Sequence, residues 1–245
     1  SDPQKEAEET TNKSKGLIKI LTEKAPEKNY ITKKLTEEIA PLLKERNKNL
    51  SKFFLQTQAP AKPTEKKPHI SIINNEDNFA HMIAHITEHL GYKTKVKTTE
   101  NFKVNEKEIV IIGPGPGDIN KMKNLNKITK ELLEKKVKTI GICLGHQAIC
   151  KSLGMKIKKQ KKSTQGLQLL ENINEKSEHV GFYNSFSPVI TNKTKLNEVN
   201  LTLNKEGRVT QIKSKNFQGF QFHPESVMTK NGYKMLEETL SNLSK

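Results

Sequence analysis

A cysteine between two glycines has the surroundings of a nucleophile in this chain. Cys143 follows the apolar run Val137–Ile142, and a helical pattern begins directly after it. Gly141 and Gly145 lie two residues away on either side. This spacing is typical of a strand–nucleophile–helix elbow, in which a tight turn with small neighbours exposes the side chain at the carboxyl end of a sheet. Because a helix N-terminus favours the thiolate form, the sequence predicts that Cys143 is a nucleophile. The alternative of a packed core thiol fits Cys150, which lies in the body of the helix without flanking glycines.

A histidine and a glutamate near the end of the chain could complete a catalytic triad. A nucleophilic cysteine needs a base and a group that orients the base. His223 ends an alternating strand, Pro224 stops the strand ladder, and Glu225 can then reach back to the imidazole. The His-Pro-Glu sequence alone is a weak signal. Together with the elbow 80 residues upstream it predicts a triad of Cys143, His223 and Glu225.

A loop of alternating glycine and proline follows another apolar strand, at residues 113–117. Glycines there leave backbone N–H groups free to face a pocket, and the prolines stiffen the loop. We expect the N–H of Gly115 and that of Leu144, the residue after the nucleophile, to form an oxyanion hole. A phosphate-binding loop is the weaker alternative because no Gly-Lys-Ser/Thr sequence follows.

Composition and charge argue against several other classes of function. The net charge of +16 invites a nucleic-acid interpretation, but Arg46 and Arg208 are the only arginines and there is no tryptophan. Base readout and phosphate recognition favour arginine, and single strands favour aromatic stacking. A lysine-rich interaction or nucleic-acid-binding module is therefore only a remote alternative. No apolar run approaches the roughly 20 residues that span a bilayer. The two cysteines lie seven residues apart in one predicted helical stretch, which makes a bridge between them geometrically implausible. We therefore expect a reducing, cytoplasmic compartment.

The pattern of apolar residues predicts an α/β fold. Only 33% of the residues are hydrophobic, and they are concentrated beyond a linker at residues 59–68 that contains three prolines. Before the linker we expect helices at residues 5–24 and 31–55. Beyond it we expect strands at 69–73, 93–98, 108–112 and 137–142, helices at 77–90, 124–135, 144–153 and 229–243, and short strands between 155 and 222. This alternation predicts a doubly wound, mostly parallel sheet with helices on both faces, plus an N-terminal helical appendage.

Three histidines spaced four residues apart could suggest a metal site on the helix at 77–90. They are His81, His85 and His89. The apolar stripe of this helix places them on its flank or outer side, and no cysteine or carboxylate cluster completes a site. The sequence therefore predicts no metal site in this chain alone.

The elbow, the Gly-Pro loop and the His-Pro-Glu sequence, in this order, resemble the class I (triad) glutamine amidotransferases over residues 68–245. The resemblance implies that Cys143 attacks the amide of L-glutamine to give a glutamyl thioester and ammonia, with His223 as base and Glu225 as orienting group. Water then releases glutamate, and the ammonia travels to a partner synthase site. The resemblance also implies an oxyanion hole from Gly115 and Leu144, and no cofactor in this domain. The side chains that it places against glutamine are Gln147 and the segment with Asn184, Ser185 and Phe186.

Finer features resemble the amidotransferases of chorismate-amidating enzymes, the group that contains anthranilate synthase. Residues 75–79, 165–168 and 181–186 read NEDNF, QGLQ and GFYNSF. These forms are similar to 2-amino-2-deoxyisochorismate synthase of phenazine-type pathways, where amidotransferase and chorismate-using domains share one chain. The alternative products are anthranilate and 4-amino-4-deoxychorismate. Ile119 stands where the family commonly has proline, which could loosen the loop but removes no catalytic group.

Residues 1–25 resemble the last helix of the chorismate-binding synthase domain. By motif, Glu9 would ligate Mg²⁺ in the complete synthase domain, although one carboxylate cannot build that site. We expect residues 1–25 to be a C-terminal remnant of that domain, 26–67 a helical, Pro/Lys-rich interdomain linker, and 68–245 the amidotransferase domain. The chain then reads as the C-terminal piece of a longer protein whose chorismate-binding domain is the partner. The expected partners include neither nucleic acid nor membrane. The family allows a homodimer of the complete enzyme, but the residues do not set the oligomeric state.

Overall fold

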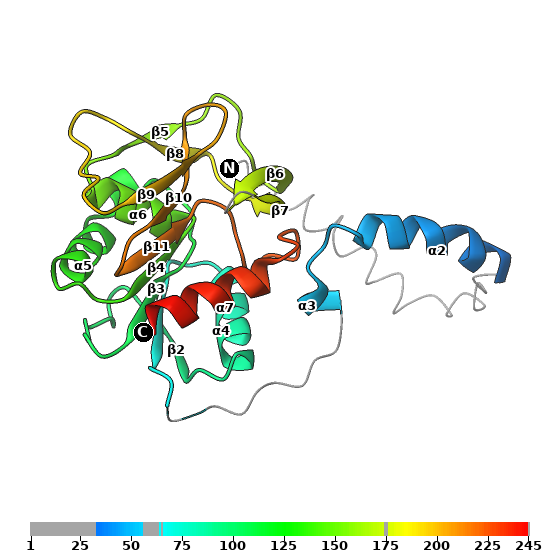
Figure 1. The fold of residues 1–245 in the computed structure, drawn as a ribbon, viewed down its shortest axis with the longest axis horizontal. Coiled ribbons are helices and arrows are strands. Elements are labelled where there is room, and N and C mark those ends of the chain that lie inside the picture. The colour runs from blue at the N-terminus through cyan, green and yellow to red at the C-terminus, as the bar shows by residue number, and fades with distance from the viewer. Residues whose placement is uncertain (1–32, 56–63, 65, 174–175, 245) are drawn as a thin grey trace, which may run out of the picture. The chain divides into compact units, whose positions relative to one another are not determined.

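The computed structural model describes residues 33–55, 64, 66–173 and 176–244 (Figure 1). The helix expected at residues 5–24, with the possible magnesium ligand Glu9, lies outside this described part. The chain divides after Lys48 into two compact units. Among the described residues, the first unit contributes one helix and the second contains every strand.

The helix expected over residues 31–55 is in fact two helices, so that prediction is wrong. α2 (Lys33–Asn47) belongs to the first unit, whereas α3 (Lys52–Leu55) is a single turn in the second unit. Between them, the backbone N–H of Ser51 donates to the carbonyl of Val227 at 2.8 Å. An N–H that is bonded outside the helix cannot continue the helical hydrogen-bond ladder, which explains the break.

A seven-stranded sheet forms the centre of the second unit, in the order β2-β1-β3-β4-β11-β10-β9. The first five strands of this order are parallel, and β10 runs antiparallel to both β11 and β9. The strands are β1 (Ile70–Asn74), β2 (Thr94–Thr98), β3 (Ile109–Ile112), β4 (Thr139–Ile142), β9 (Asn200–Leu203), β10 (Val209–Lys213) and β11 (Phe217–Phe220).

Helices cover both faces of this sheet, which explains why its inner strands are apolar throughout. One core contains side chains of α4 (Phe79–His89) and α7 (Gly232–Leu243), and the other those of α5 (Lys123–Glu134) and α6 (Leu144–Ser152) (Figure 1). Successive residues of β1 alternate between them, since Ile72 packs in the first and Ile73 in the second. The expected doubly wound, mostly parallel architecture is confirmed, and these helices begin and end within three residues of the predicted positions.

Two small antiparallel pairs and one short helix complete the unit. β6 (Leu167–Ile173) pairs with β7 (Lys176–Phe182), and β5 (Lys156–Lys159) pairs with β8 (Phe186–Val189). The 3-10 helix η1 (Ile119–Lys121) precedes α5. After β7 the chain continues into residues 183–185, which lie near the carboxyl ends of the central strands.

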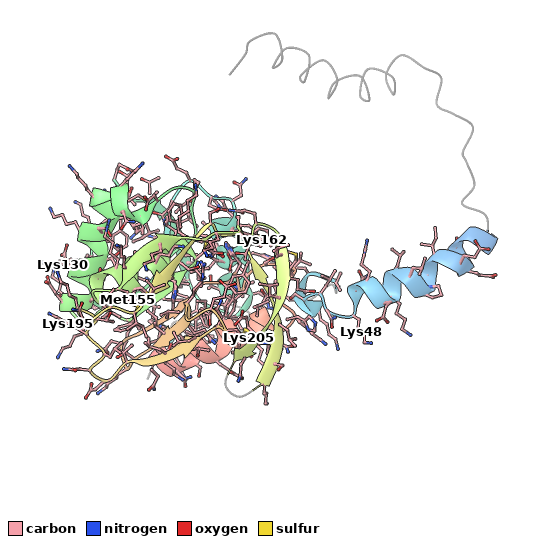
Figure 2. All side chains as sticks on the ribbon, turned by 90° about the horizontal axis from the view of Figure 1, so that it is seen from above. Lys48, Lys130, Met155, Lys162, Lys195 and Lys205 are labelled. Carbon is pink, nitrogen blue, oxygen red and sulfur yellow. The ribbon has the colours of Figure 1, made fainter. Side chains whose placement is uncertain are left out.

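Lysine side chains are spread over the surface rather than gathered on one element. Lys130 on α5, Lys195 before β9 and Lys205 after β9 are all exposed (Figure 2). This distribution does not favour the remote nucleic-acid-binding alternative, which would gather basic side chains on one face. Among the described helices, none combines the length and the apolar character that a bilayer crossing requires.

Candidate active site

The backbone at Cys143 is strained, as expected for a side chain displayed on a tight elbow. Cys143 lies between β4 and α6 with φ 52° and ψ −99°, a conformation that residues with a side chain rarely adopt. A Cβ on Gly141 would come within 2.7 Å of the carbonyl group of Gly145, and one on Gly145 would come within 2.1 Å of the carbonyl oxygen of Ile112. Both glycines are therefore required by close backbone approach, and they fix the direction of the thiol.

Pairing of β4 with β11 brings the cysteine to the histidine. Phe220, the last residue of β11, is in register with Ile142, the last residue of β4. The N–H of Cys143 donates to the Phe220 carbonyl at 2.8 Å, and the chain reaches His223 three residues later. Cys143 and His223 then line one cavity of about 330 Å³ at the carboxyl ends of the strands.

A buried glutamate holds the imidazole. His223 Nδ1 and Glu225 Oε1 are 2.8 Å apart, and both side chains are almost completely buried. A carboxylate only accepts hydrogen bonds, so Nδ1 carries the proton and donates to Glu225. The opposite ring nitrogen, Nε2, is buried and makes no hydrogen bond within the described residues. It is therefore left as the atom that can exchange a proton with the thiol.

Charge interactions favour the protonated form of this histidine. Burial by itself would lower the pKa of His223, but the charge of Glu225, the charge of Cys143 and the hydrogen bond to Glu225 outweigh it. The pKa of His223 is raised well above its usual value as a result. An imidazolium beside Cys143 is the state that stabilises a thiolate, which is the nucleophilic form of cysteine.

Two aromatic rings flank the imidazole. Phe79, at the start of α4, and Tyr183, directly after β7, have ring centroids 4.8 Å and 4.9 Å from that of His223. They also contact each other at 5.0 Å. The tyrosine hydroxyl is fixed in turn by Ser226 at 3.0 Å. These contacts restrict rotation of the His223 ring and keep water from its faces. Sequence reasoning used Phe79 in the apolar stripe of this helix and in the subfamily stretch at residues 75–79, and did not place it against the imidazole.

A second histidine near the thiol cannot serve as the base. His146 is completely buried in α6, where its Nε2 contacts the Val209 carbonyl at 3.1 Å. Burial lowers the pKa of His146 to about 4, although backbone hydrogen bonds to Val209 and Gly219 oppose the shift. It stays neutral near pH 7, and its other contact is with the sulfur of Cys150 at 3.5 Å. Cys150 is fully buried, and burial raises its pKa well above the usual value, as expected for a core thiol.

The glycine-proline loop forms one wall of the cavity. Gly115 and Leu144 line it together with Cys143, and neither backbone N–H makes a hydrogen bond within the described part of the chain. A Cβ on Gly115 would come within 2.5 Å of both Cβ and the carbonyl oxygen of Asn75. Asn75 supports the loop by donating from its amide to the Gly113 carbonyl at 2.9 Å. The two N–H groups are thus available for an oxyanion beside the sulfur.

Polar groups of the β7–β8 connection form the opposite wall. Asn184, Ser185 and Phe186 all line the cavity, as do Gln147 and Gln165. The amide of Asn184 donates to the Phe186 carbonyl at 2.8 Å, which curls the segment back on itself. Every residue that the sequence analysis placed against glutamine therefore borders this cavity. Gln165 belongs to a stretch that was used there only to distinguish subfamilies.

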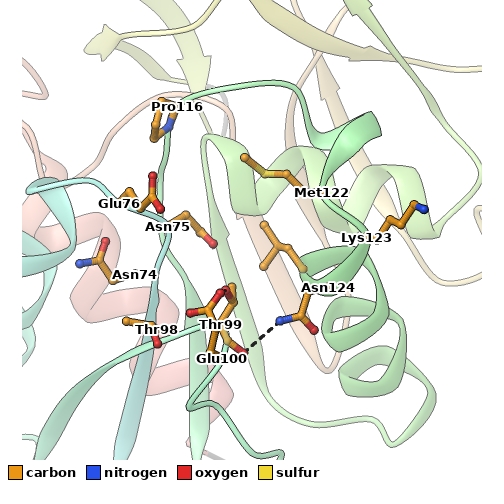
Figure 3. Close-up of a pocket in the computed structure, with 11 residues that line it drawn as sticks. Asn74, Asn75, Glu76, Thr98, Thr99, Glu100, Pro116, Met122, Lys123 and Asn124 are labelled. Carbon is orange, nitrogen blue, oxygen red and sulfur yellow. Dashed lines mark hydrogen bonds between the residues drawn. The ribbon is translucent and has the colours of Figure 1, made fainter.

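A neighbouring cavity of about 370 Å³ lies behind the glycine-proline loop (Figure 3). It is lined by residues such as Asn74, Thr98 and Asn124, and it contains neither the thiol nor the imidazole. Its only lining residue in common with the cavity of Cys143 is Pro116. The chemistry described above is thus confined to the cavity of about 330 Å³.

The histidine-rich face of α4 serves packing. His85 and His89 contact the ring of Phe53 from α3, with centroid distances of 5.5 Å and 5.1 Å. His89 also contacts the Tyr233 hydroxyl at 3.2 Å, whereas His81 is exposed. In the part of the chain that is described, no group of His, Cys, Asp or Glu side chains could hold a metal ion.

Comparison with known proteins finds relatives in sequence and a similar fold among solved structures. The sequence model of the family described as "Glutamine amidotransferase class-I" matches residues 71–243. "Anthranilate synthase, phenazine specific" of Pseudomonas chlororaphis is 28% identical over 256 residues, and "Anthranilate synthase component 2" of Saccharolobus solfataricus is 30% identical over 190. The first alignment covers 98% of this chain but only 39% of the relative, and the second covers 70% and 97%. A crystal structure of a glutamine amidotransferase from Thermotoga maritima has a TM-score of 0.56 at 14% identity, covering 72% of this chain and 96% of that one.

Proposed function

This chain belongs to the class I glutamine amidotransferase family, and from that premise we propose that Cys143, His223 and Glu225 are the groups with which it hydrolyses glutamine. The observation that carries the proposal is the buried 2.8 Å contact between His223 Nδ1 and Glu225 Oε1, in a ring whose other nitrogen shares a cavity with the thiol. The paired charges of a thiolate and an imidazolium supply a nucleophile and a proton donor at the same place.

The reaction follows from these groups. The Cys143 thiolate attacks the side-chain carbonyl carbon of glutamine, forming a C–S bond while the carbonyl electrons move to oxygen. The N–H groups of Gly115 and Leu144 stabilise that negative oxygen. His223 gives its proton to the departing nitrogen, the C–N bond breaks, and ammonia leaves a glutamyl thioester. His223 then takes a proton from water, the resulting hydroxide attacks the thioester, and glutamate leaves with regeneration of the thiolate.

Release of glutamate from glutamine tests this assignment. Cys143→Ser should abolish the activity, and Cys150→Ser provides a matched control because that thiol is buried against His146, outside the cavity. The isolated chain can be slow if contacts with a partner complete the site. A low rate that depends on Cys143 still supports the mechanism, whereas an unchanged rate in Cys143→Ser would show that it is wrong.

We further propose that the ammonia serves a chorismate-using synthase domain. The chain spans 39% of the length of the phenazine-specific anthranilate synthases that it matches across 98% of its own residues. That relationship and the resemblance of residues 75–79, 165–168 and 181–186 favour 2-amino-2-deoxyisochorismate as the product. The alternatives are anthranilate, which the names of the component 2 relatives support, and 4-amino-4-deoxychorismate. We propose Mg²⁺ for the complete enzyme only. Glu9, the possible ligand in this chain, lies outside the described residues.

Product analysis with the complete protein, chorismate, glutamine and Mg²⁺ separates these choices. The aminodeoxy products keep the enolpyruvyl ether of chorismate, whereas anthranilate has lost it as pyruvate, so mass spectrometry distinguishes the two groups. The two aminodeoxy compounds are isomers and must be resolved by chromatography against standards. Anthranilate as the first product formed, with no aminodeoxy compound preceding it, would overturn the proposed product but leave the glutaminase assignment intact.

A further inference from the structure

A buried glutamine that the triad mechanism does not use contacts the sulfur. Gln221 is 1% exposed, and its side-chain Nε2 lies 3.8 Å from Cys143 Sγ. Its Oε1 lies 3.3 Å from Nε2 of Gln147. No other hydrogen bond of this side chain occurs within the described residues. A buried amide is costly unless it is bonded, and both partners of this one border the site.

The direction of these hydrogen bonds is fixed from one end. The Phe186 carbonyl can only accept, and Gln147 Nε2 lies 3.0 Å from it. The nitrogen of Gln147 must therefore point to this side, and its second N–H donates to the oxygen of Gln221. That leaves the NH₂ group of Gln221 facing Cys143. We call this series, from the Phe186 carbonyl through Gln147 and Gln221 to Cys143, the amide chain.

We propose that Gln221 is a catalytic residue that donates an N–H to the Cys143 thiolate and so favours the nucleophilic form of the sulfur. A thiolate is a stronger acceptor than a thiol, so a donor aimed at the sulfur favours the charged state. His223 approaches the same sulfur with a proton that it must later give to the leaving nitrogen. The amide N–H donates a hydrogen bond but is too weak an acid to give up its proton. It therefore stabilises the sulfur without competing for the proton transfer. Gln147, which lines the cavity, connects this donor to the wall expected to contact glutamine.

If the Gln221 side chain had only a structural role, removing its N–H would leave the reactivity of the Cys143 sulfur unchanged. The backbone N–H of Gln221 donates to the Thr210 carbonyl at 2.9 Å, and this contact with the end of β10 does not depend on the side chain. The side chain also lines a second cavity of about 220 Å³ together with Ser187 and Thr210. Alanine at this position would enlarge that cavity and admit water. Methionine keeps the length and volume of glutamine but removes both the donor to the sulfur and the acceptor of Gln147, whereas glutamate removes the donor and keeps an acceptor for Gln147.

Alkylation of the thiol by iodoacetamide measures this effect without glutamine or an acceptor. The thiolate forms a bond to the methylene carbon as the C–I bond breaks and iodide leaves, so the rate at each pH reports the thiolate fraction. We expect Gln221→Met to move the midpoint of the pH dependence of alkylation upward by about one unit, which lowers the rate by about tenfold at pH values below the midpoint of the unmutated protein. Gln221→Glu, which places a carboxylate beside the sulfur, should move it at least as far. Gln211→Met, at another buried glutamine on β10, is the matched control and should leave rate and midpoint unchanged.

An unchanged midpoint in both Gln221 variants, with melting temperatures close to that of the unmutated protein, would overturn the proposal. If neither variant folds, the unmutated protein gives the answer by NMR. The assigned side-chain N–H₂ resonances of Gln221 should shift with pH at the alkylation midpoint, and this shift should vanish once Cys143 is alkylated. Resonances that do not respond to the state of the sulfur would contradict the proposal, whatever the glutaminase assay shows.

Discussion

The carboxylate of Glu225 should control both the rate of the reaction and the way in which stability depends on pH. Glu225→Gln keeps the shape of the side chain but removes the charge that lies 2.8 Å from His223 Nδ1. The charge-assisted hydrogen bond lost is worth about 1.5–3 kcal/mol, which corresponds to a factor of roughly ten to a hundred. An amide can also turn its NH₂ toward the ring and impose the tautomer in which Nε2 carries the proton, which removes the base. In comparable triads that change alone costs about 10⁴ in kcat. We therefore expect kcat for glutamine hydrolysis to fall by between about 10² and 10⁴.

The same variant should change the pH profile of the unfolding free energy. The folded pKa of His223 is raised above the value of about 6.5 expected in the unfolded chain. The stability that this shift contributes is fully present below pH 6.5 and is lost as the pH rises through the folded pKa. Glu225→Gln removes the charge of Glu225, which is the largest of the interactions that raise the pKa of His223. The difference in unfolding free energy between the unmutated protein and the variant should therefore be largest near pH 6 and shrink toward pH 9.

Urea unfolding at several pH values, together with glutaminase assays of the complete protein, would test both effects. Glu237→Gln is a suitable control, because it makes the same chemical change on α7, outside the cavity of Cys143. Two results would refute the reasoning: a kcat for Glu225→Gln within threefold of the unmutated value, or a stability difference that stays constant between pH 6 and pH 9.

Three further expectations concern the surroundings of the site. Iodoacetamide should label Cys143 in the folded protein but Cys150 only after unfolding, because burial raises the pKa of the latter thiol; peptide mass mapping reads the two sites. Gly115→Ala should lower kcat by about 10² or more, since its Cβ would displace the loop that carries an oxyanion N–H. Gly207→Ala, where a Cβ meets no atom within 4 Å but the backbone has φ +72°, should lower stability and leave kcat unchanged in the same assay. Phe53→Ala should lower the unfolding free energy by about 3 kcal/mol, measured by urea unfolding, because that ring is buried and stacks on a tyrosine ring 4.8 Å away.

The sequence predicted the fold well because the strands and helices of the second unit are short, strongly patterned and separated by clear breaks. β3 reads Ile-Val-Ile-Ile and is buried throughout, which a parallel strand covered on both faces requires. The helix over residues 31–55 was predicted wrongly because its continuity is decided by a distant partner, the Val227 carbonyl that binds the N–H of Ser51. No local pattern contains that contact.

The sequence located the candidate triad but missed the residues that support it. Cys143 and His223 follow recognisable motifs, yet only the pairing of β11 with β4 places them in one cavity. Phe79 has the spacing of a core residue on α4, and its contact with the imidazole arises from tertiary packing. Gln221 precedes His223 by two residues, and in an alternating strand that spacing indicates the same face. This was a usable signal that the sequence analysis did not exploit.

Three independent constraints converge on the sulfur, and each comes from a different part of the chain. The elbow between β4 and α6 fixes the Cβ, the segment after β11 brings the imidazole and the Gln221 amide, and the Phe186 carbonyl at the start of β8 orients that amide through Gln147. Only the elbow belongs to the same stretch of chain as the thiol, whereas the other two are brought to it by the pairing of β11 with β4 and by the segment that joins β7 to β8. The site should therefore be lost as a unit when β11 or the β7–β8 connection is removed, even though Cys143 and its glycines would remain. Burial by itself disfavours both charges, so the thiolate and imidazolium depend on their attraction to each other and to Glu225. Partial assembly would admit water to the site, and water would weaken that attraction.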